Sequence, residues 1–361
     1  MEQRSEPDLP LARIVIVGGG FSGAMTAVNV ARFAGHPLHV TVVDQRGPVG
    51  RGIAYGIRRP EYLLNVSARN MSAFPDEPDH FVQWLRTRAD FASVPDAELP
   101  TRFVPRQIYG DYVCAIVLQH LMSPGGMTPV VSDVVIGEAV DIEPADLGCH
   151  VHLADGSTLD ADRVVLATGN EPPALLPGAE SLAGHPSWIP NPWQSWEQRL
   201  PHEGHGIVVL GTGLSTVDVI LTLRAVGWTG RIDAVSRHGW FPHSHFRSVE
   251  DPEFPPPGVD LAALRLDALR TLVEQHCAAL RERDANPAMA VDNLRSQTQR
   301  IWRGFTLEER MDFISEDAAR WNVHRHRIAP ELHAVLADAE RTSQLRVHAA
   351  GIEKLEASED A

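Results

Sequence analysis

Two groups of spaced glycines are the residues of this 361-residue chain whose types and spacing predict chemistry. In the first group, RIVIVGGGFSG at residues 13–23, Gly18, Gly20 and Gly23 follow a β-branched apolar run at the spacing G-x-G-x-x-G. The first glycine permits a tight turn, the second lets the backbone approach a pyrophosphate, and the third lets a helix pack closely. The pattern predicts a site for the phosphates of a dinucleotide.

The residues that follow predict the other parts of such a site. The alanine-rich segment 24–35 is predicted to form a helix whose N-terminal amides and dipole face the phosphates. Residues 38–44 are predicted to form a strand ending in Asp44, where a carboxylate can accept hydrogen bonds from ribose hydroxyls. Because strand, glycines, helix, strand and acid arrive in order, we favour a nucleotide site over a merely glycine-rich turn.

A second fingerprint, IVVLGTGLSTVD at residues 207–218, repeats the first two glycines as Gly211 and Gly213. Its third position is Thr216, which is larger but compatible with helix packing, and Thr212 and Ser215 complete the candidate phosphate loop. A degenerate half-domain that binds nothing is the alternative for this motif.

The strand predicted after the second fingerprint, RIDAVSRHG, ends in Ser236 and Arg237 without the acid found at Asp44. An arginine at this point can pair with a 2′-phosphate, so the sequence favours NADP(H) over NAD(H). A solvated charge at the strand end is the alternative for Arg237.

Residues 150–170, HVHLADGSTLDADRVVLATGN, predict a hairpin that turns at Asp155-Gly156 and then a returning strand. The strand leads into Ala167, Thr168 and Gly169, whose small side chains would let a bound cofactor pack against them. An ordinary exit from strand to loop is the alternative.

Composition excludes several classes of protein. The net charge of −15 argues against a nucleic-acid partner, which needs clustered Lys and Arg. The three cysteines are far apart in sequence, so we expect reduced thiols rather than a disulfide scaffold or a dithiol redox pair. With no signal-peptide pattern and no apolar run long enough to span a bilayer, the sequence predicts a cytoplasmic protein with no membrane partner.

Several segments together resemble a known family. They are RIVIVGGGFSG, GRGIAYG (50–56), LLNVSARNMSAFPDEPDHFVQWL (63–85), FVPRQIYGDYV (103–113), VVLATGNEPP (164–173) and VVLGTGLSTVDV (208–219). They look like the FAD/NAD(P)-binding proteins of the two-dinucleotide-domain flavoprotein superfamily. Within it they are similar to the branch of flavin-dependent N-hydroxylases and other class B monooxygenases. The resemblance runs from about residue 12 to the C-terminus.

The resemblance implies where an FAD would bind. It places Phe21 and Ser22, with the three glycines, around the pyrophosphate, Asp44 at the adenosine ribose, and Thr168 and Gly169 against the cofactor. It places the loop from Gly50 to Gly56, which contains Arg51, together with Arg106, along the flavin half. A surface arginine that caps the following helix is the alternative for Arg106, and packing beneath the sheet is favoured for Asn65 and Met71.

The resemblance also implies a reaction. Hydride would pass from NADPH to FAD, and reduced flavin would react with oxygen to give a C4a-hydroperoxide that hydroxylates a small amine or amino acid. A flavin dehydrogenase and a non-catalytic, sensor-like FAD/NAD(P)-binding protein are the alternatives. No catalytic side chain is identified, since the chemistry would be centred on the flavin. LAGHPSWIPNPW (182–193) lacks the FxGxxxHxxxW spacing, so Baeyer-Villiger chemistry is not supported and His185 is expected to pack in a linker.

The predicted fold class is α/β, with two Rossmann-like domains, the second inserted in the first, a β-meander and a helical insertion. We expect an FAD domain over 1–175, an NADP(H) domain with the helical insertion over 176–325, and a return to the FAD domain over 326–361. The last segment resembles residues 130–143, but the hairpin and strand expected next do not follow. We therefore expect either that the chain is a fragment or that its natural form lacks part of the flavin-binding wall. The histidine pairs at 243/245 and 324/326 lack the context of a metal site, so no metal is expected.

Overall fold

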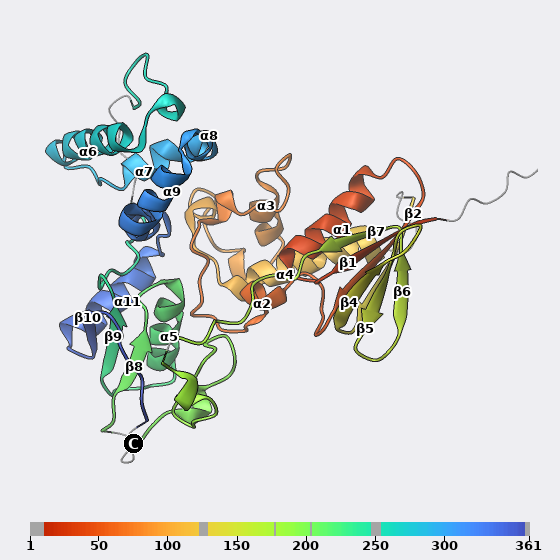
Figure 1. Ribbon diagram of the computed structural model, residues 1–361, viewed down its shortest axis with the longest axis horizontal. Helices are drawn as coiled ribbons and strands as arrows, with labels where there is room; N and C mark the ends of the chain where they lie inside the picture. The colour runs from red at the N-terminus through yellow and green to blue at the C-terminus, as the bar shows by residue number, and fades with distance from the viewer. Residues whose placement is uncertain (1–10, 123–128, 177, 203, 247–253, 358–361) are drawn as a thin grey trace, which may run out of the picture. The chain divides into compact units, whose positions relative to one another are not determined.

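The computed structural model describes residues 11–122, 129–176, 178–202, 204–246 and 254–357. The chain divides into two compact units, residues 1–174 and 175–361, which follow one another along the sequence (Figure 1). The predicted insertion of the second domain into the first is therefore not seen. The first two residues of the proline-rich segment 252–260 lie outside the described residues.

The first unit alternates strands and helices around a parallel sheet. Its elements are β1 (Ala12–Val17), α1 (Phe21–Phe33), β2 (Leu38–Asp44), α2 (Gly52–Gly56), α3 (His80–Arg86), α4 (Arg106–Val117), β3 (Val130–Ile136), β4 (Ala139–Pro144), β5 (Cys149–Leu153), β6 (Thr158–Ala161) and β7 (Arg163–Leu166). The sheet has the order β3-β2-β1-β7, and all its strands are parallel.

Side chains of β1 and β2 alternate between two buried faces of this sheet. Ile16 and Val42 are paired in register and face the cluster that includes residues of α1 and α4, whereas Val15 and Val43 face the antiparallel strands. Burial on both sides explains why these strands are almost continuously apolar. The helix predicted over 24–35 is present as α1, and the strand predicted over 38–44 is present as β2.

The antiparallel layer of the first unit is the predicted β-meander, with order β4-β5-β6. Its β5-β6 turn contains Asp155 and Gly156, as predicted; Gly156 has a φ of +86° and Asp155 Oδ1 accepts a hydrogen bond from Ser157 N (2.9 Å). Val151 and Leu153 of β5 are buried with Val15 and Val43. The meander therefore covers the face of the parallel sheet that lies opposite the helices.

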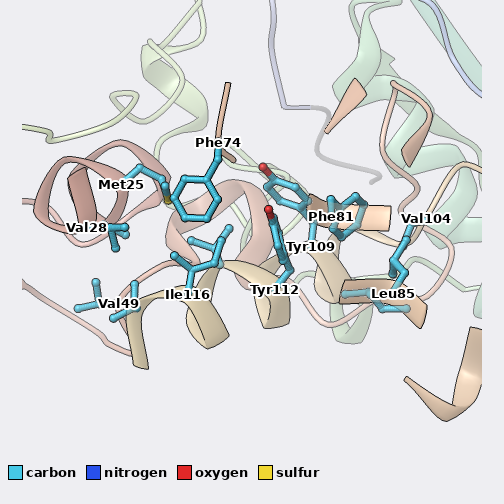
Figure 2. Packing of buried hydrophobic residues seen from close by; sticks show 14 of the residues in the cluster. Met25, Val28, Val49, Phe74, Phe81, Leu85, Val104, Tyr109, Tyr112 and Ile116 are labelled. Atoms are coloured by element: carbon cyan, nitrogen blue, oxygen red, sulfur yellow. The ribbon is translucent and has the colours of Figure 1, made fainter. Parts of the chain in front are cut away.

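Aromatic rings fill the helical side of the first unit (Figure 2). Tyr109 and Tyr112 of α4 are buried, with ring centroids 5.4 Å apart, and both contact Phe81 of α3. Burial raises the pKa of both tyrosines. This cluster fixes α4 under the loops that follow β1 and β2.

The second unit has a smaller parallel sheet and a group of helices. Its elements are β8 (Ile207–Leu210), α5 (Leu214–Ala225), β9 (Ile232–Ser236), α6 (Leu266–Glu282), α7 (Met289–Leu294), α8 (Thr298–Gly304), α9 (Leu307–Asp312), α10 (Ala318–Arg325), α11 (Pro330–Arg341) and β10 (Leu345–Ala349). Its described strands are parallel in the order β10-β9-β8. Together the two units form a mixed α/β fold consistent with the predicted Rossmann-like domains.

Strand β10 belongs to the sheet of the second unit, whereas the sequence predicts it in the first domain. The sequence predicts that residues 326–361 return to the first domain, but Leu345–Ala349 pair in register with Ile232–Ser236 of β9. The resemblance between this segment and residues 130–143 has a structural basis, because β10 lies beside β9 as β3 lies beside β2. The repeated sequence thus marks the equivalent strand of a second sheet.

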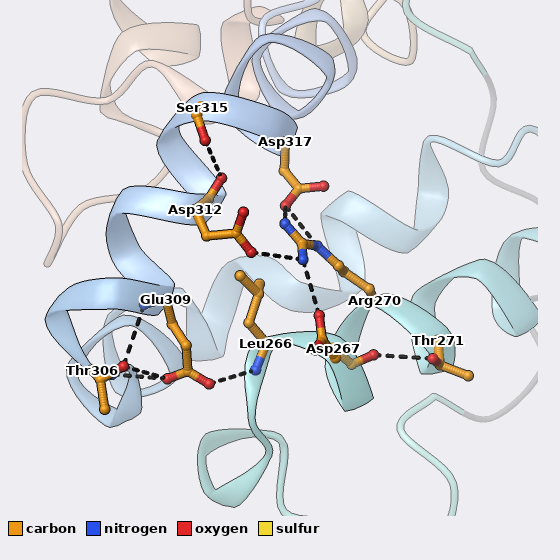
Figure 3. Close-up of polar contacts among 9 residues, drawn as sticks. All are labelled: Leu266, Asp267, Arg270, Thr271, Thr306, Glu309, Asp312, Ser315 and Asp317. Atoms are coloured by element: carbon orange, nitrogen blue, oxygen red, sulfur yellow. Dashed lines mark hydrogen bonds and ion pairs between the residues drawn. The ribbon is translucent and has the colours of Figure 1, made fainter.

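The helical segment α6–α10 has its own apolar cluster, which includes Leu266, Leu269, Ile301 and Phe305. Figure 3 shows the polar contacts beside it. Glu309 forms a capping box with Thr306 at the start of α9, and its Oε1 accepts a hydrogen bond from the Leu266 backbone N–H (3.0 Å). The predicted helical insertion is therefore a packed subdomain.

Arg270 of α6 links three acidic side chains of this segment (Figure 3). Its Nε and Nη2 donate to Asp317 Oδ2 (2.9 and 2.6 Å), and its Nη1 donates to Asp312 Oδ2 (2.9 Å) and Asp267 Oδ1 (3.0 Å). The Asp267 side chain is 92% exposed, whereas that of Asp317 is 32% exposed. The contact with Asp317 should therefore contribute more to stability than the contact with Asp267.

We expect Asp317→Asn to lower the free energy of unfolding by about 0.5–1 kcal/mol, because it weakens a two-bond contact that is partly shielded from water. The matched variant Asp267→Asn should change it by less than about 0.5 kcal/mol. Urea unfolding at low and high salt measures both, and the Asp317 effect should shrink at high salt. Equal effects of the two variants would contradict this ranking.

Candidate functional site

The first fingerprint forms a tight turn at the carboxyl end of β1. Gly18 N–H donates to Val43 O at 2.8 Å, and Gly18 has a φ of +105°, which disfavours any residue with a side chain. A Cβ at Gly18 would lie 2.2 Å from Ala167 O. The Ala167-Thr168-Gly169 segment after β7 is therefore in direct contact with the turn.

Gly23 brings α1 against this turn. A Cβ at Gly23 would lie 1.8 Å from Gly18 O, so only glycine allows the helix to pack at this distance. Gly20, the N-cap residue of α1, provides no side-chain cap. The first backbone N–H groups of α1 therefore have neither an intrahelical acceptor nor a capping side chain, which leaves them available to an anion such as phosphate.

Asp44 lies beside the glycine turn at the end of β2. Its Oδ2 accepts a hydrogen bond from Gly19 N (2.7 Å), and its Oδ1 accepts bonds from Arg46 N and Gly47 N (both 2.9 Å). Oδ1 thus accepts two hydrogen bonds and Oδ2 one, so Oδ2 retains acceptor capacity for a ribose hydroxyl. Sequence reasoning missed Gly19, where a Cβ would lie 2.8 Å from Asp44 Cβ. The signal was the run VGGGF, in which Gly19 is the middle of three consecutive glycines.

The loop after β2 returns to the first fingerprint. Gly50 N–H donates to Gly19 O at 2.7 Å, which places this loop beside the glycine turn. The Arg51 side chain, however, is largely buried: its guanidinium pairs with Asp111 and donates to Gln107 O at 3.3 Å. Arg51 thus joins the loop to α4, and any contact it makes with a cofactor would come from its backbone.

The remaining predicted residues of the first site fall into two groups. Ser22, Thr168 and Gly169 are exposed at the carboxyl end of the sheet. The Phe21 ring contacts Tyr55 and Tyr109, so it faces the aromatic cluster.

Arg106 begins α4, and its Nε donates to Leu63 O at 3.1 Å. It therefore tethers residue 63 rather than extending freely into solvent. Asn65 is half-buried, and Met71 packs on the core of the unit. For Met71 this agrees with the packing role that the sequence favours.

The second fingerprint repeats the geometry of the first. Gly211 N–H donates to Val235 O at 2.7 Å and has a φ of +108°, matching Gly18 and Val43. At the third position the Thr216 hydroxyl donates to Gly211 O at 2.9 Å. Gly211 O is the equivalent of Gly18 O, the oxygen that excludes a Cβ at Gly23. In the second loop this oxygen accepts a hydrogen bond from the Thr216 side chain, so the replacement of glycine by threonine preserves the contact between helix and turn.

The end of β9 differs chemically from the end of β2. Ser236 stands at the position of Asp44 and is hydrogen-bonded to Thr212 Oγ1 at 2.8 Å. Arg237 is exposed, and its side chain makes no hydrogen bond or ion pair with the described residues. Ser215 is also exposed, in the first turn of α5, whose N-cap Gly213 provides no side-chain cap. This set of groups suits a phosphorylated nucleotide.

The histidine pairs have a packing role. His243 and His324 stack with ring centroids 4.8 Å apart and planes at 15°. Burial, with His243 and nearby arginines, lowers the pKa of His324 to about 4, and burial with His333 and Arg327 lowers that of His243. Within the described ranges, no three His, Cys, Asp or Glu side chains are grouped to hold a metal ion.

The cysteines offer little for nucleophilic chemistry. All three are free thiols, and burial raises the pKa of the Cys114 and Cys277 thiols. His185 Nδ1 accepts a hydrogen bond from Ser187 N at 3.2 Å within the linker.

The two fingerprints are where the described groups fit a bound cofactor. Each uncapped helix start suits a dinucleotide phosphate, and the neighbouring strand end offers a carboxylate in the first unit and an arginine in the second.

Comparison with known proteins supports this interpretation. Residues 15–171 match a family model described as FAD-NAD(P)-binding, so the predicted family resemblance is confirmed for the first unit. No curated protein matches the chain.

Solved structures share the fold at low identity. The ornithine N-hydroxylase of Kutzneria sp. 744 is 16% identical with a TM-score of 0.53 over 93% of this chain and 71% of its own. The reduced ornithine hydroxylase of Pseudomonas aeruginosa is 16% identical with a TM-score of 0.55, covering 97% and 75%. The L-lysine 6-monooxygenase of Pseudomonas syringae is 16% identical with a TM-score of 0.54, covering 96% and 74%. In the described part of the chain, no helix combines the length and apolarity needed to cross a membrane.

We expect Gly23→Ala and Gly213→Ala to separate folding from ligand binding. Alanine at position 23 meets Gly18 O, so the free energy of unfolding should fall by about 1–3 kcal/mol or more. A Cβ at Gly213 meets no atom within 4 Å, so this variant should keep its melting temperature but bind NADPH more weakly. Thermal melts and calorimetric titration measure both, and a stable Gly23→Ala variant would contradict the packing role.

We expect the second unit to lose stability as the pH falls from about 6.5 towards 4. Over this range the unfolded chain protonates His324 and His243, whereas the folded unit keeps His324 neutral until its pKa of about 4. Urea unfolding across pH 4–8 measures the dependence. His324→Phe should flatten it, and an unchanged slope in that variant would contradict the assignment to this ring pair.

Proposed function

We propose that this chain is an FAD- and NADPH-dependent monooxygenase that hydroxylates a small amine or amino acid. The observation that carries the proposal is the pair of equivalent glycine turns with different strand ends, Asp44 in the first unit and Ser236-Arg237 in the second. The first turn then takes FAD and the second takes NADPH. The likeness of the fold to ornithine and lysine hydroxylases supports the substrate class.

The first unit binds FAD through groups already positioned in the turn. The N–H groups at the start of α1 bind the pyrophosphate, and Asp44, oriented by three backbone N–H groups, accepts a hydrogen bond from a ribose hydroxyl through Oδ2. Thr168, Gly169, the Gly50 loop and Arg106 lie along the rest of the cofactor. FAD supplies the redox chemistry when bound, because it can accept a hydride and, once reduced, react with oxygen.

The second unit selects NADPH through its strand end. Arg237 has no competing partner among the described residues, so its guanidinium can pair with the 2′-phosphate of the nucleotide. A carboxylate at the position of Ser236 would instead repel that phosphate. Thr212, Ser215 and the N–H groups at the start of α5 complete the phosphate contacts.

The purified chain, loaded with FAD, tests the reaction. NADPH oxidation in the presence of oxygen should be accelerated by ornithine, lysine or another small amine, and mass spectrometry should find a product heavier by one oxygen atom. Reduction of the flavin without an oxygenated product would favour a flavin dehydrogenase. A chain that binds both nucleotides but whose flavin is not reduced by NADPH would favour the non-catalytic alternative.

We expect Arg237→Gln to lower the affinity for NADPH by about tenfold or more and to leave the affinity for NADH nearly unchanged, because only NADPH carries the 2′-phosphate. Arg231→Gln is the matched control, since Arg231 precedes the other end of β9 and pairs with Asp233. Titration of each variant with NADPH and with NADH measures the ratio of the two affinities. A parallel loss of NADPH and NADH binding in Arg237→Gln would contradict this role.

A further inference from the structure

Two aromatic rings stack immediately beyond the end of β9. The centroids of His238 and Trp240 are 4.5 Å apart and their planes are inclined by 16°. Trp240 is 44% exposed and His238 is also exposed, so the pair is accessible to a ligand. A large exposed indole in a fixed position needs an explanation, because exposed tryptophans frequently mark binding surfaces.

A closed set of hydrogen bonds holds the turn that carries these rings. The Thr212 hydroxyl donates to Trp240 O at 2.6 Å, and since a hydroxyl has one proton, its other contact, with Ser236 Oγ at 2.8 Å, must be donated by Ser236. Ser236 Oγ in turn accepts from Gly239 N at 3.0 Å. Gly239 has a φ of +64°, which suits glycine. The turn is therefore attached to the glycine loop that binds phosphate.

The equivalent turn of the first unit is built differently. Asp44 closes it by accepting hydrogen bonds from Arg46 N and Gly47 N, and the residues between Asp44 and Gly47 are Gln45 and Arg46, without an aromatic ring. In the second unit the corresponding residue, Ser236, orients an aromatic pair. The two turns thus share a position in the fold but present different surfaces to a nucleotide.

The adenosine ribose of a dinucleotide lies at the end of the second strand. Since the adenine is bonded directly to that ribose, it lies within reach of the residues that follow the strand. Trp240 lies four residues past Ser236, on a turn attached to Thr212. We propose that the Trp240 and His238 rings form the surface on which the adenine of the nicotinamide dinucleotide stacks, while Arg237 binds the 2′-phosphate. This inference rests on the proposed assignment of the second unit to NADPH.

Four ligands separate the contacts: NADPH, NADH, adenosine 2′,5′-bisphosphate, and reduced nicotinamide mononucleotide, which has no adenine. Each is titrated calorimetrically into the FAD-loaded full chain. Trp240→Ala should weaken binding of the three adenine ligands by a similar factor, about tenfold or more, and leave the mononucleotide unaffected. Arg237→Gln should instead change the ratio of the affinity for NADPH to the affinity for NADH. Trp240→Phe should restore most of the affinity.

Trp240→Leu guards against a folding defect, because it keeps an apolar side chain but removes the aromatic face. It should keep the wild-type melting temperature and bind the adenine ligands as weakly as Trp240→Ala. The inference is overturned if Trp240→Leu binds adenosine 2′,5′-bisphosphate as the wild type does. A wild-type chain that binds none of the four ligands overturns both this inference and the proposed function, whereas normal NADPH binding by Trp240→Ala and Trp240→Leu overturns the inference alone.

Discussion

The contact between a glycine turn and the first turn of the next helix is the constraint on which both candidate sites depend. In the first unit Gly18 O lies so close to Gly23 that no side chain fits between them. In the second unit the same oxygen, Gly211 O, accepts a hydrogen bond from Thr216. Either arrangement fixes the start of the helix at the carboxyl end of the sheet and leaves its N–H groups uncapped. In the proposed function, phosphate recognition follows from this packing.

The strand beside each turn then decides which nucleotide fits. Asp44 is a carboxylate oriented by three backbone N–H groups, whereas Ser236 is a neutral hydroxyl within a chain of hydrogen bonds that ends at Trp240 O. The first arrangement suits an unphosphorylated ribose. The second leaves Arg237 exposed and orients two aromatic rings. In the proposed function, one repeated backbone geometry therefore carries two specificities.

Local patterns allowed much of this to be predicted from the sequence. Spaced glycines after β-branched runs located both turns, and the Asp155-Gly156 pair located the hairpin, because each of these features is set by neighbouring residues. Features that depend on distant partners were not predictable. The Arg51–Asp111 pair joins a loop to α4, and β10 joins β9 across more than one hundred residues. The role of Trp240 required knowledge of the hydrogen bonds to Thr212 and Ser236.

A crystal structure of the chain with FAD and NADP⁺ tests the central claim most directly. The account predicts the FAD pyrophosphate at the Gly18–Gly23 turn with its ribose on Asp44, and the 2′-phosphate of NADP⁺ on Arg237. Electron density for NADP⁺ at Asp44, or for FAD at the second turn, would contradict it.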